Sequence, residues 1–111
     1  MKSPLSALAL VTLLLAPAGC ISDDAIGCDF RNRGDNPEPR CQERSGIQAS
    51  EVFGATCDSL GGESLDGGCP EAGLVAGCEI GDDVVDWYYE PFTTAEIQQR
   101  CADEGSSFVT K

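Results

Sequence analysis

Seven cysteines are the residues best able to form covalent bonds in this 111-residue chain, which contains no histidine. Without an imidazole, the chain has no Ser-His-Asp or Cys-His pair for nucleophilic catalysis and no histidine ligand for zinc. The cysteine spacings include no Cys-x-x-Cys pair, which also disfavours a zinc site built from thiolates. The cysteines therefore predict disulfide bonds in an exported protein. We expect no enzymatic activity, no metal and no other cofactor.

Acidic side chains offer two further candidate sites. The turn Gly81-Asp82-Asp83 together with Asp86 has oxygen ligands for calcium, but its spacing fits no EF-hand loop, and a solvent-exposed turn is the better interpretation. Asp86 and Glu90 flank Tyr88 on one face of an expected strand. Four residues along a strand separate two carboxylates by roughly 13 Å, which is too far for a glycosidase pair. We therefore expect Tyr88, Asp86 and Glu90 to form a polar contact surface on the outer face of the sheet.

The chain is strongly acidic, with 19 acidic and 7 basic residues and a net charge of −12. Such a surface repels phosphate backbones, so we expect no nucleic-acid partner. The length allows a single domain. A domain of about 80 residues has a marginal core, which gives disulfide bonds a clear stabilising role.

The first 19 residues have the pattern of an export signal. Lys2 supplies the positive charge, and the apolar run over 5–15 is too short to cross a membrane. Cleavage after Ala16-Pro17-Ala18 would leave Gly19 as the first residue of a secreted protein. Ala18-Gly19-Cys20 instead resembles the lipobox of bacterial lipoproteins, in which the cysteine becomes the first residue and its sulfur carries lipid.

The number of cysteines favours lipidation of Cys20. Seven is odd, and an exported protein rarely keeps an unpaired thiol. If Cys20 carries lipid, the remaining six can pair, and several acyl chains on one residue hold a protein firmly on a membrane. Ile21 follows the cysteine; in enterobacterial lipoproteins an aspartate there retains the protein at the inner membrane, so the resemblance implies the outer membrane. We expect a signal peptide over 1–19, a tether over 20–27 and a six-cysteine domain over 28–111.

Local patterns predict two helices and several strands. The capping box Thr93-Thr94-Ala95-Glu96 begins a helix that Gly105 ends, and a second helix runs from near Ser50 to Gly61-Gly62. Alternating apolar residues predict a hairpin of strands over 73–80 and 84–90. Weaker signals predict strands over 63–65 and 107–110, whereas the arm over 28–40 looks irregular.

These elements predict a small, disulfide-rich α+β domain, with one antiparallel sheet of three to five short strands and two helices on one face. The expected core consists of residues on the apolar faces of those elements. They are Phe53, Cys57, Leu60, Leu74, Cys78, Ile80, Val85, Trp87, Tyr89, Phe92, Ile97, Cys101 and Phe108.

Six cysteines allow fifteen connectivities, and packing narrows them. Cys78 shares a strand face with Leu74 and Ile80, and Cys101 lies on the apolar side of the capped helix, so we expect a Cys78–Cys101 bond. A weak repeat between the two halves of the chain then suggests Cys41–Cys57, which leaves Cys28–Cys69. The alternative scheme keeps Cys78–Cys101 and pairs Cys57 with Cys69 and Cys28 with Cys41.

Residues 28–108 carry six short motifs that belong together: Cys41-Gln42-Glu43, Cys57-Asp58-Ser59-Leu60-Gly61-Gly62, Cys69-Pro70, Val75-Ala76-Gly77-Cys78, Trp87-Tyr88-Tyr89 and Cys101 to Phe108. In this pattern the chain resembles a group of small six-cysteine bacterial predicted lipoproteins. The group has no assigned activity, so the resemblance implies an architecture and a location and no chemistry.

The sequence thus predicts a lipid-anchored module of the bacterial cell envelope, attached to a membrane through Cys20. We expect it to bind an unidentified protein or envelope ligand, or to serve structurally. A secreted, disulfide-rich inhibitor or toxin-like scaffold without lipid is the alternative. A hydrolase that uses carboxylates alone is a third hypothesis, and it requires two acidic side chains that converge in a pocket.

Overall fold

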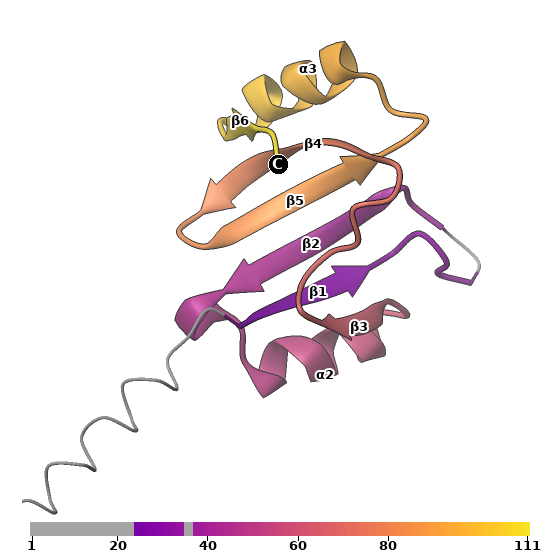
Figure 1. Ribbon diagram of the computed structural model, residues 1–111, viewed down its shortest axis with the longest axis vertical. Helices are drawn as coiled ribbons and strands as arrows, with labels where there is room; N and C mark the ends of the chain where they lie inside the picture. The colour runs from indigo at the N-terminus through magenta and orange to yellow at the C-terminus, as the bar shows by residue number, and fades with distance from the viewer. Residues whose placement is uncertain (1–23, 35–36) are drawn as a thin grey trace, which may run out of the picture.

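A computed structural model describes residues 24–34 and 37–111. It contains a six-stranded antiparallel sheet in the order β3-β1-β2-β5-β4-β6, together with two α-helices and one 3-10 turn (Figure 1). In chain order the elements are β1 (Ala25–Asp29), β2 (Arg40–Ser45), η1 (Gly46–Gln48), α2 (Glu51–Ser59), β3 (Glu63–Asp66), β4 (Leu74–Gly81), β5 (Val84–Tyr89), α3 (Thr94–Glu104) and β6 (Ser107–Val109). The α+β class is as predicted, but the sheet has six strands and not three to five.

Both helices begin and end where their capping residues predict. In α3 the Glu96 amide donates to Thr93 Oγ1 at 3.2 Å, and Thr93 N donates to Glu96 Oε1 at 2.9 Å. Gly105 ends α3 in the left-handed conformation, with φ of 73°. Ser50 caps α2 by accepting from the Phe53 amide at 3.3 Å.

The two helices lie on the same face of the sheet, over its two opposite ends. A row of directly opposed residues crosses five strands, and its side chains share one face: Cys28, Gln42, Asp86, Cys78 and Phe108. Cys28 is bonded to Cys57 of α2, and Cys78 is bonded to Cys101 of α3. Because α2 packs over β1 and β3 and α3 over β4 and β6, the central strands β2 and β5 lie between them (Figure 1).

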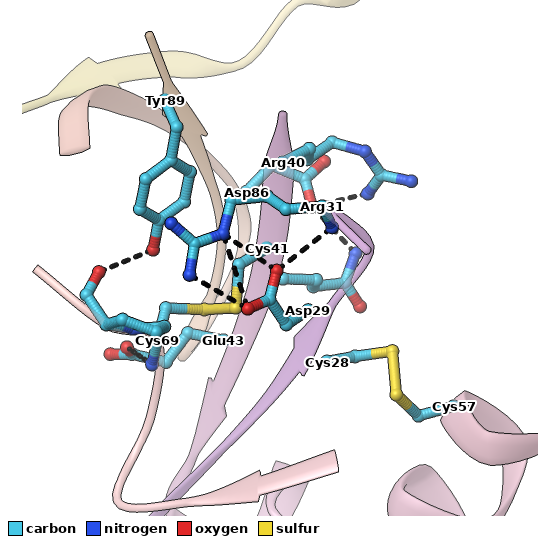
Figure 2. The surroundings of a disulfide bond; sticks show 12 residues. Cys28, Asp29, Arg31, Arg40, Cys41, Glu43, Cys57, Cys69, Asp86 and Tyr89 are labelled. Atoms are coloured by element: carbon cyan, nitrogen blue, oxygen red, sulfur yellow. Dashed lines mark hydrogen bonds and ion pairs between the residues drawn. A yellow bond between two sulfur atoms is a disulfide. The ribbon is translucent and has the colours of Figure 1, made fainter. Parts of the chain in front are cut away.

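The opposite face is covered by the segment 67–73, which we call the strap. The Cys41–Cys69 disulfide ties the strap to β2, and Glu43 Oε1 accepts from the Cys69 amide at 2.8 Å (Figure 2). Tyr89 donates to the Pro70 carbonyl at 2.6 Å, and burial raises the pKa of this tyrosine to about 12. Trp87, Tyr89 and the disulfide form a buried cluster under the strap.

Strand alternation explains why only one predicted disulfide is correct. Cys78–Cys101 forms as expected, with Cα atoms 5.4 Å apart. The Cys41–Cys57 and Cys28–Cys69 pairs are wrong, and so is the alternative scheme, because the other bonds are Cys28–Cys57 and Cys41–Cys69. Cys28 lies opposite Gln42, and Cys41 therefore points to the other face, away from both helices.

Two further predictions about the chain are corrected. The predicted tether over 20–27 ends earlier, since β1 begins at Ala25, and the arm predicted to be irregular contributes Cys28 and Asp29 to the end of β1 and Arg40 to the start of β2. Leu60 and Ile80 were expected in the core, but they are 58% and 44% exposed. Cys28, Phe30, Cys41, Cys69, Ala76 and Tyr88 are buried core residues that the sequence did not indicate.

Gly77 of β4 has no room for a side chain, and this yields a stability prediction. A Cβ at Gly77 would lie 2.7 Å from Trp87 Cε3 and 2.8 Å from the Asp86 carbonyl oxygen. We expect Gly77→Ala to lower the free energy of unfolding by about 1–3 kcal/mol, because backbone and indole must shift. Gly81→Ala in the same strand meets nothing within 4 Å, and we expect a change below about 0.5 kcal/mol. Urea unfolding of both variants measures the difference, and equal effects would contradict the packing of Trp87 on Gly77.

Candidate functional site

The predicted contact surface of Tyr88, Asp86 and Glu90 is divided between different environments. Tyr88 is 2% and Asp86 8% exposed, and both lie on the helix face; Glu90 follows β5 and is exposed. The expectation that all three form an outer polar face is therefore wrong for Tyr88 and Asp86. The cause is an irregularity between Glu79 and Gly81, which shifts the hairpin register and places Cys78 opposite Asp86.

Asp86 is the centre of a polar network between the two helices. Its Oδ1 accepts from Gln42 Nε2 at 2.9 Å and from Arg40 Nη1 at 3.3 Å. Arg40 also contacts Glu38 Oε1 at 3.1 Å, and Arg44 Nε donates to Gln42 Oε1 at 3.1 Å. Because Arg40, Gln42 and Arg44 alternate along β2, the network extends along the middle of the helix face.

A pocket of about 210 Å³ opens between α2 and this network. Arg40 and Arg44 form its polar side, with their guanidinium carbons 4.6 Å above the Phe30 ring and 4.4 Å above the Phe53 ring. The full lining is Cys28, Phe30, Arg40, Gln42, Arg44, Phe53, Thr56, Cys57 and Leu60. This lining includes two arginines and no carboxylate, although the chain carries 19 acidic residues. We call it the α2 pocket.

The two arginines of the α2 pocket differ in how many of their guanidinium donors are already bonded within the protein. The guanidinium groups of Arg40 and Arg44 both lie over aromatic rings, but Arg40 also forms ion pairs with Glu38 and Asp86. Arg44 donates through Nε to Gln42 and has no ion-pair partner among the described residues. Its two terminal nitrogens are therefore free to donate to a ligand.

On the α3 side, a second hollow of about 510 Å³ has a different character. Arg100 lies over Tyr88 and Phe92 at 5.3 and 5.1 Å, but acidic residues surround it, and the lining is Phe92, Glu96, Gln99, Arg100, Asp103 and Glu104. Burial raises the pKa of Tyr88, and the charges of Asp86 and Glu104 raise it further. Three carboxylates and one guanidinium line this side, so it lacks the excess of cationic groups that an anion requires.

The described residues bring no metal-binding cluster together. No group of three or more histidine, cysteine, aspartate or glutamate side chains in residues 24–34 and 37–111 is arranged to hold a metal ion. Asp86, once considered with the 81–83 turn for calcium, instead points into the helix face and bonds to Gln42 and Arg40. The two carboxylates of the hydrolase hypothesis, Asp86 and Glu90, lie in different environments, one buried and one exposed.

Sequence reasoning missed the residues of the α2 pocket. The signal was present, because Arg40, Gln42 and Arg44 recur at every second position, as polar residues on one face of a strand do. It was overlooked because the preceding Pro37-Glu38-Pro39 favours irregular structure. A strand at 40–45 would have placed two of the few basic residues, Arg40 and Arg44, on the same face.

Cys20, the predicted lipidation site, lies outside the described residues, and its modification stays a prediction. Within the part of the chain that is described, no helix is long and apolar enough to cross a membrane. The chain matches no protein-family model, and comparisons with curated proteins and with solved structures find no match.

Proposed function

We propose that this protein is a non-enzymatic binding module of the bacterial cell envelope, anchored in the outer membrane by lipid on Cys20, and that its α2 pocket binds an anionic group. The observation that carries the binding function is the lining of that pocket. It combines two ring-stacked arginines with apolar side chains and contains no carboxylate, in a chain with a net charge of −12.

The arrangement of Arg44 favours a carboxylate or phosphate. Its guanidinium plane is held by the Phe53 ring and by Gln42, so little side-chain freedom is lost when a ligand binds. A planar guanidinium with free terminal nitrogens donates two parallel hydrogen bonds to an oxyanion. The pocket therefore supplies a fixed cation where the rest of the surface is mostly acidic.

The size of the α2 pocket limits what it can hold. A volume of about 210 Å³ lies below the roughly 300–1,000 Å³ typical of sites for whole small molecules. Phe30, Phe53 and the exposed Leu60 offer apolar contact beside the arginines. The ligand group that fits is a carboxylate on a short aliphatic chain, which occurs both in free short-chain acids and at the C-terminus of a peptide that ends in leucine.

A titration followed by NMR tests the binding function and separates the two sources. The probes are hexanoate, a peptide without charged side chains that ends in a free leucine carboxylate, and the same peptide with an amidated C-terminus. We expect saturable shifts of the Arg44 Hε resonance with the first or second probe and none with the amide. Lack of saturation with both carboxylates would contradict the proposal.

Matched variants make the binding test specific. Arg44→Gln is expected to weaken binding at least tenfold, because it removes the charged donor while keeping a polar side chain. Lys111→Gln removes the same charge from the strap face, where Lys111 lies 5.3 Å from the Trp87 ring, and binding should stay within twofold. Equal losses in both variants would show a general charge effect and not a site.

The location is tested separately by cell fractionation. The three disulfides support an exported protein, because such bonds persist in oxidising compartments. We expect the parent protein in the outer-membrane fraction and Cys20→Ser in the soluble fraction or as an unprocessed precursor. A soluble parent protein that begins at Gly19 would favour the secreted scaffold instead.

A further inference from the structure

Large aliphatic side chains are exposed at one end of the domain. Ile47 in η1 is 92% exposed, Val52 in the first turn of α2 is 73% exposed, and Ile80 beside the β4–β5 turn is 44% exposed. Leu60, a further large exposed aliphatic residue of the described domain, lies at the far end of α2 and belongs to the rim of the α2 pocket. The packing of the described domain does not account for the exposure of Ile47 and Val52.

The same end of the domain receives the chain from the N-terminal segment. Ala25, the first residue of β1, lies opposite Ser45, the last residue of β2, and η1 follows directly. The Ser45 amide donates to the Asp83 carbonyl at 3.0 Å, which places the β4–β5 turn there too. Asp24 and Ala25 share a surface hollow with Ala49, which joins η1 to α2. Figure 1 shows η1, the β4–β5 turn and the beginning of β1 at the same end of the sheet.

We infer that this end, defined by Ile47 and Val52, is a membrane-contacting tip that inserts shallowly into the bilayer that holds the acyl chains. The inference rests on the proposed lipidation of Cys20. Ala25 is five positions after Cys20, so the chain between them spans at most roughly 18 Å, and Ile47 follows two residues after Ser45, the partner of Ala25. The lipid and the two aliphatic side chains are thus confined to one end of the domain.

The charges around the tip determine which lipid surface it suits. Asp24, Glu51, Asp66, Asp82 and Asp83 are exposed at this end, whereas η1 and the link to α2 carry no charge between Gly46 and Ser50. Arg44 is the basic residue nearest to η1 along the chain, and it is directed to the Phe53 ring. An acidic rim around a neutral apolar turn favours zwitterionic headgroups and is repelled by anionic ones. The orientation also leaves the far end of the helix face, with Leu60 at the rim of the α2 pocket, directed away from the bilayer.

Paramagnetic broadening by spin-labelled lipid tests this orientation. The lipidated full chain, labelled with ¹⁵N, is placed in phosphatidylcholine nanodiscs that contain a lipid spin-labelled near the headgroup. We expect the amide signals of Ile47 and Val52 to lose at least half of their intensity, while those of Leu60 and Ser59 keep most of theirs. Replacing part of the phosphatidylcholine by phosphatidylglycerol should reduce the broadening at Ile47.

Variants and a chemical tether keep the test decisive. The double variant Ile47→Ser/Val52→Ser is expected to stay on the nanodisc through its lipid but to lose the broadening, whereas Leu60→Ser should retain it. If Cys20 proves not to be acylated, the proposed anchor fails, and coupling the Cys20 thiol to a maleimide lipid restores the same tether for this measurement. Equal broadening at Ile47 and Leu60 in a tethered protein, or protection of Ile47 by self-association, would overturn the membrane-contacting tip.

Discussion

Replacing Cys78 and Cys101 together by alanine is expected to lower the free energy of unfolding by about 3–4 kcal/mol. The bond closes a loop with a sequence separation of 23, and the chain-entropy model assigns roughly this value to a loop of that length. Both residues are at most 2% exposed and belong to the cluster that joins α3 to β4 and β5. Since single domains are stable by only about 5–15 kcal/mol, this loss leaves a small margin.

Hydrogen exchange would show which helix loses protection when the disulfide is removed. Urea unfolding followed by circular dichroism gives the free energy, and amide exchange in α3 should increase more than exchange in α2. The matched variant Cys28→Ala/Cys57→Ala removes a bond of similar separation, 29 residues, from the other helix. It should reverse the pattern and leave α3 the better protected helix. A loss below about 1 kcal/mol, or equal exchange in both helices, would contradict separate attachment of the two helices.

The sequence predicted those elements whose signals are local. The capping residues Thr93 and Ser50 act within four residues of themselves, so the helices could be placed from the chain alone. The hairpin of β4 and β5 was visible because its apolar residues alternate on both sides of a short turn. Cys78–Cys101 followed because both residues belong to these well-defined elements.

The first two strands were missed because their stability comes from distant partners. β1 contains Gly27 and Asp29 and looks unsuited to a strand, but Gly27 is needed where a Cβ would lie 2.9 Å from the Gly68 carbonyl carbon of the strap. Asp29 is 4% exposed and is neutralised by Arg31, whose Nη2 lies 2.9 Å from its Oδ2 (Figure 2). Neither contact can be inferred from neighbouring residues, and with β1 and β2 unplaced the remaining disulfides could not be paired.

Asp86 and Tyr88 were predicted on the wrong face of the sheet for a different reason, which involves a single residue. A regular hairpin with Gly81 opposite Val84 would put Cys78 opposite Trp87 and leave Asp86 and Tyr88 on the outer face. Ile80 has no partner in β5, so the register moves by one residue and Cys78 meets Asp86. Because side chains alternate, this one-residue shift transfers Asp86 and Tyr88 to the helix face and Trp87 to the strap face.

The stability of the variant Asp86→Ala therefore distinguishes the shifted hairpin register from the regular one. We expect this variant to lower the free energy of unfolding by about 2 kcal/mol. Asp86 is 8% exposed and accepts from Gln42 and Arg40, so its loss leaves donors in a largely buried place without their acceptor. Hydrogen bonds to charged groups contribute roughly 1.5–3 kcal/mol, and an unsatisfied buried donor costs a similar amount.

Two companion variants show whether the cost comes from this network. Asp82→Ala removes an exposed carboxylate from the neighbouring turn and should change stability by less than about 0.5 kcal/mol. Asp86→Asn keeps an acceptor for Gln42 but removes the charge that faces Arg40, so its cost should lie between the other two, as measured by urea unfolding. If Asp86→Ala is as mild as Asp82→Ala, Asp86 faces solvent, the regular hairpin register holds, and the bonds from Gln42 and Arg40 to Asp86 are not formed as described. If the three variants follow the expected order, the shifted register holds, and Asp86 lies on the face that Arg40 and Gln42 share, where it bonds to both side chains beside the α2 pocket.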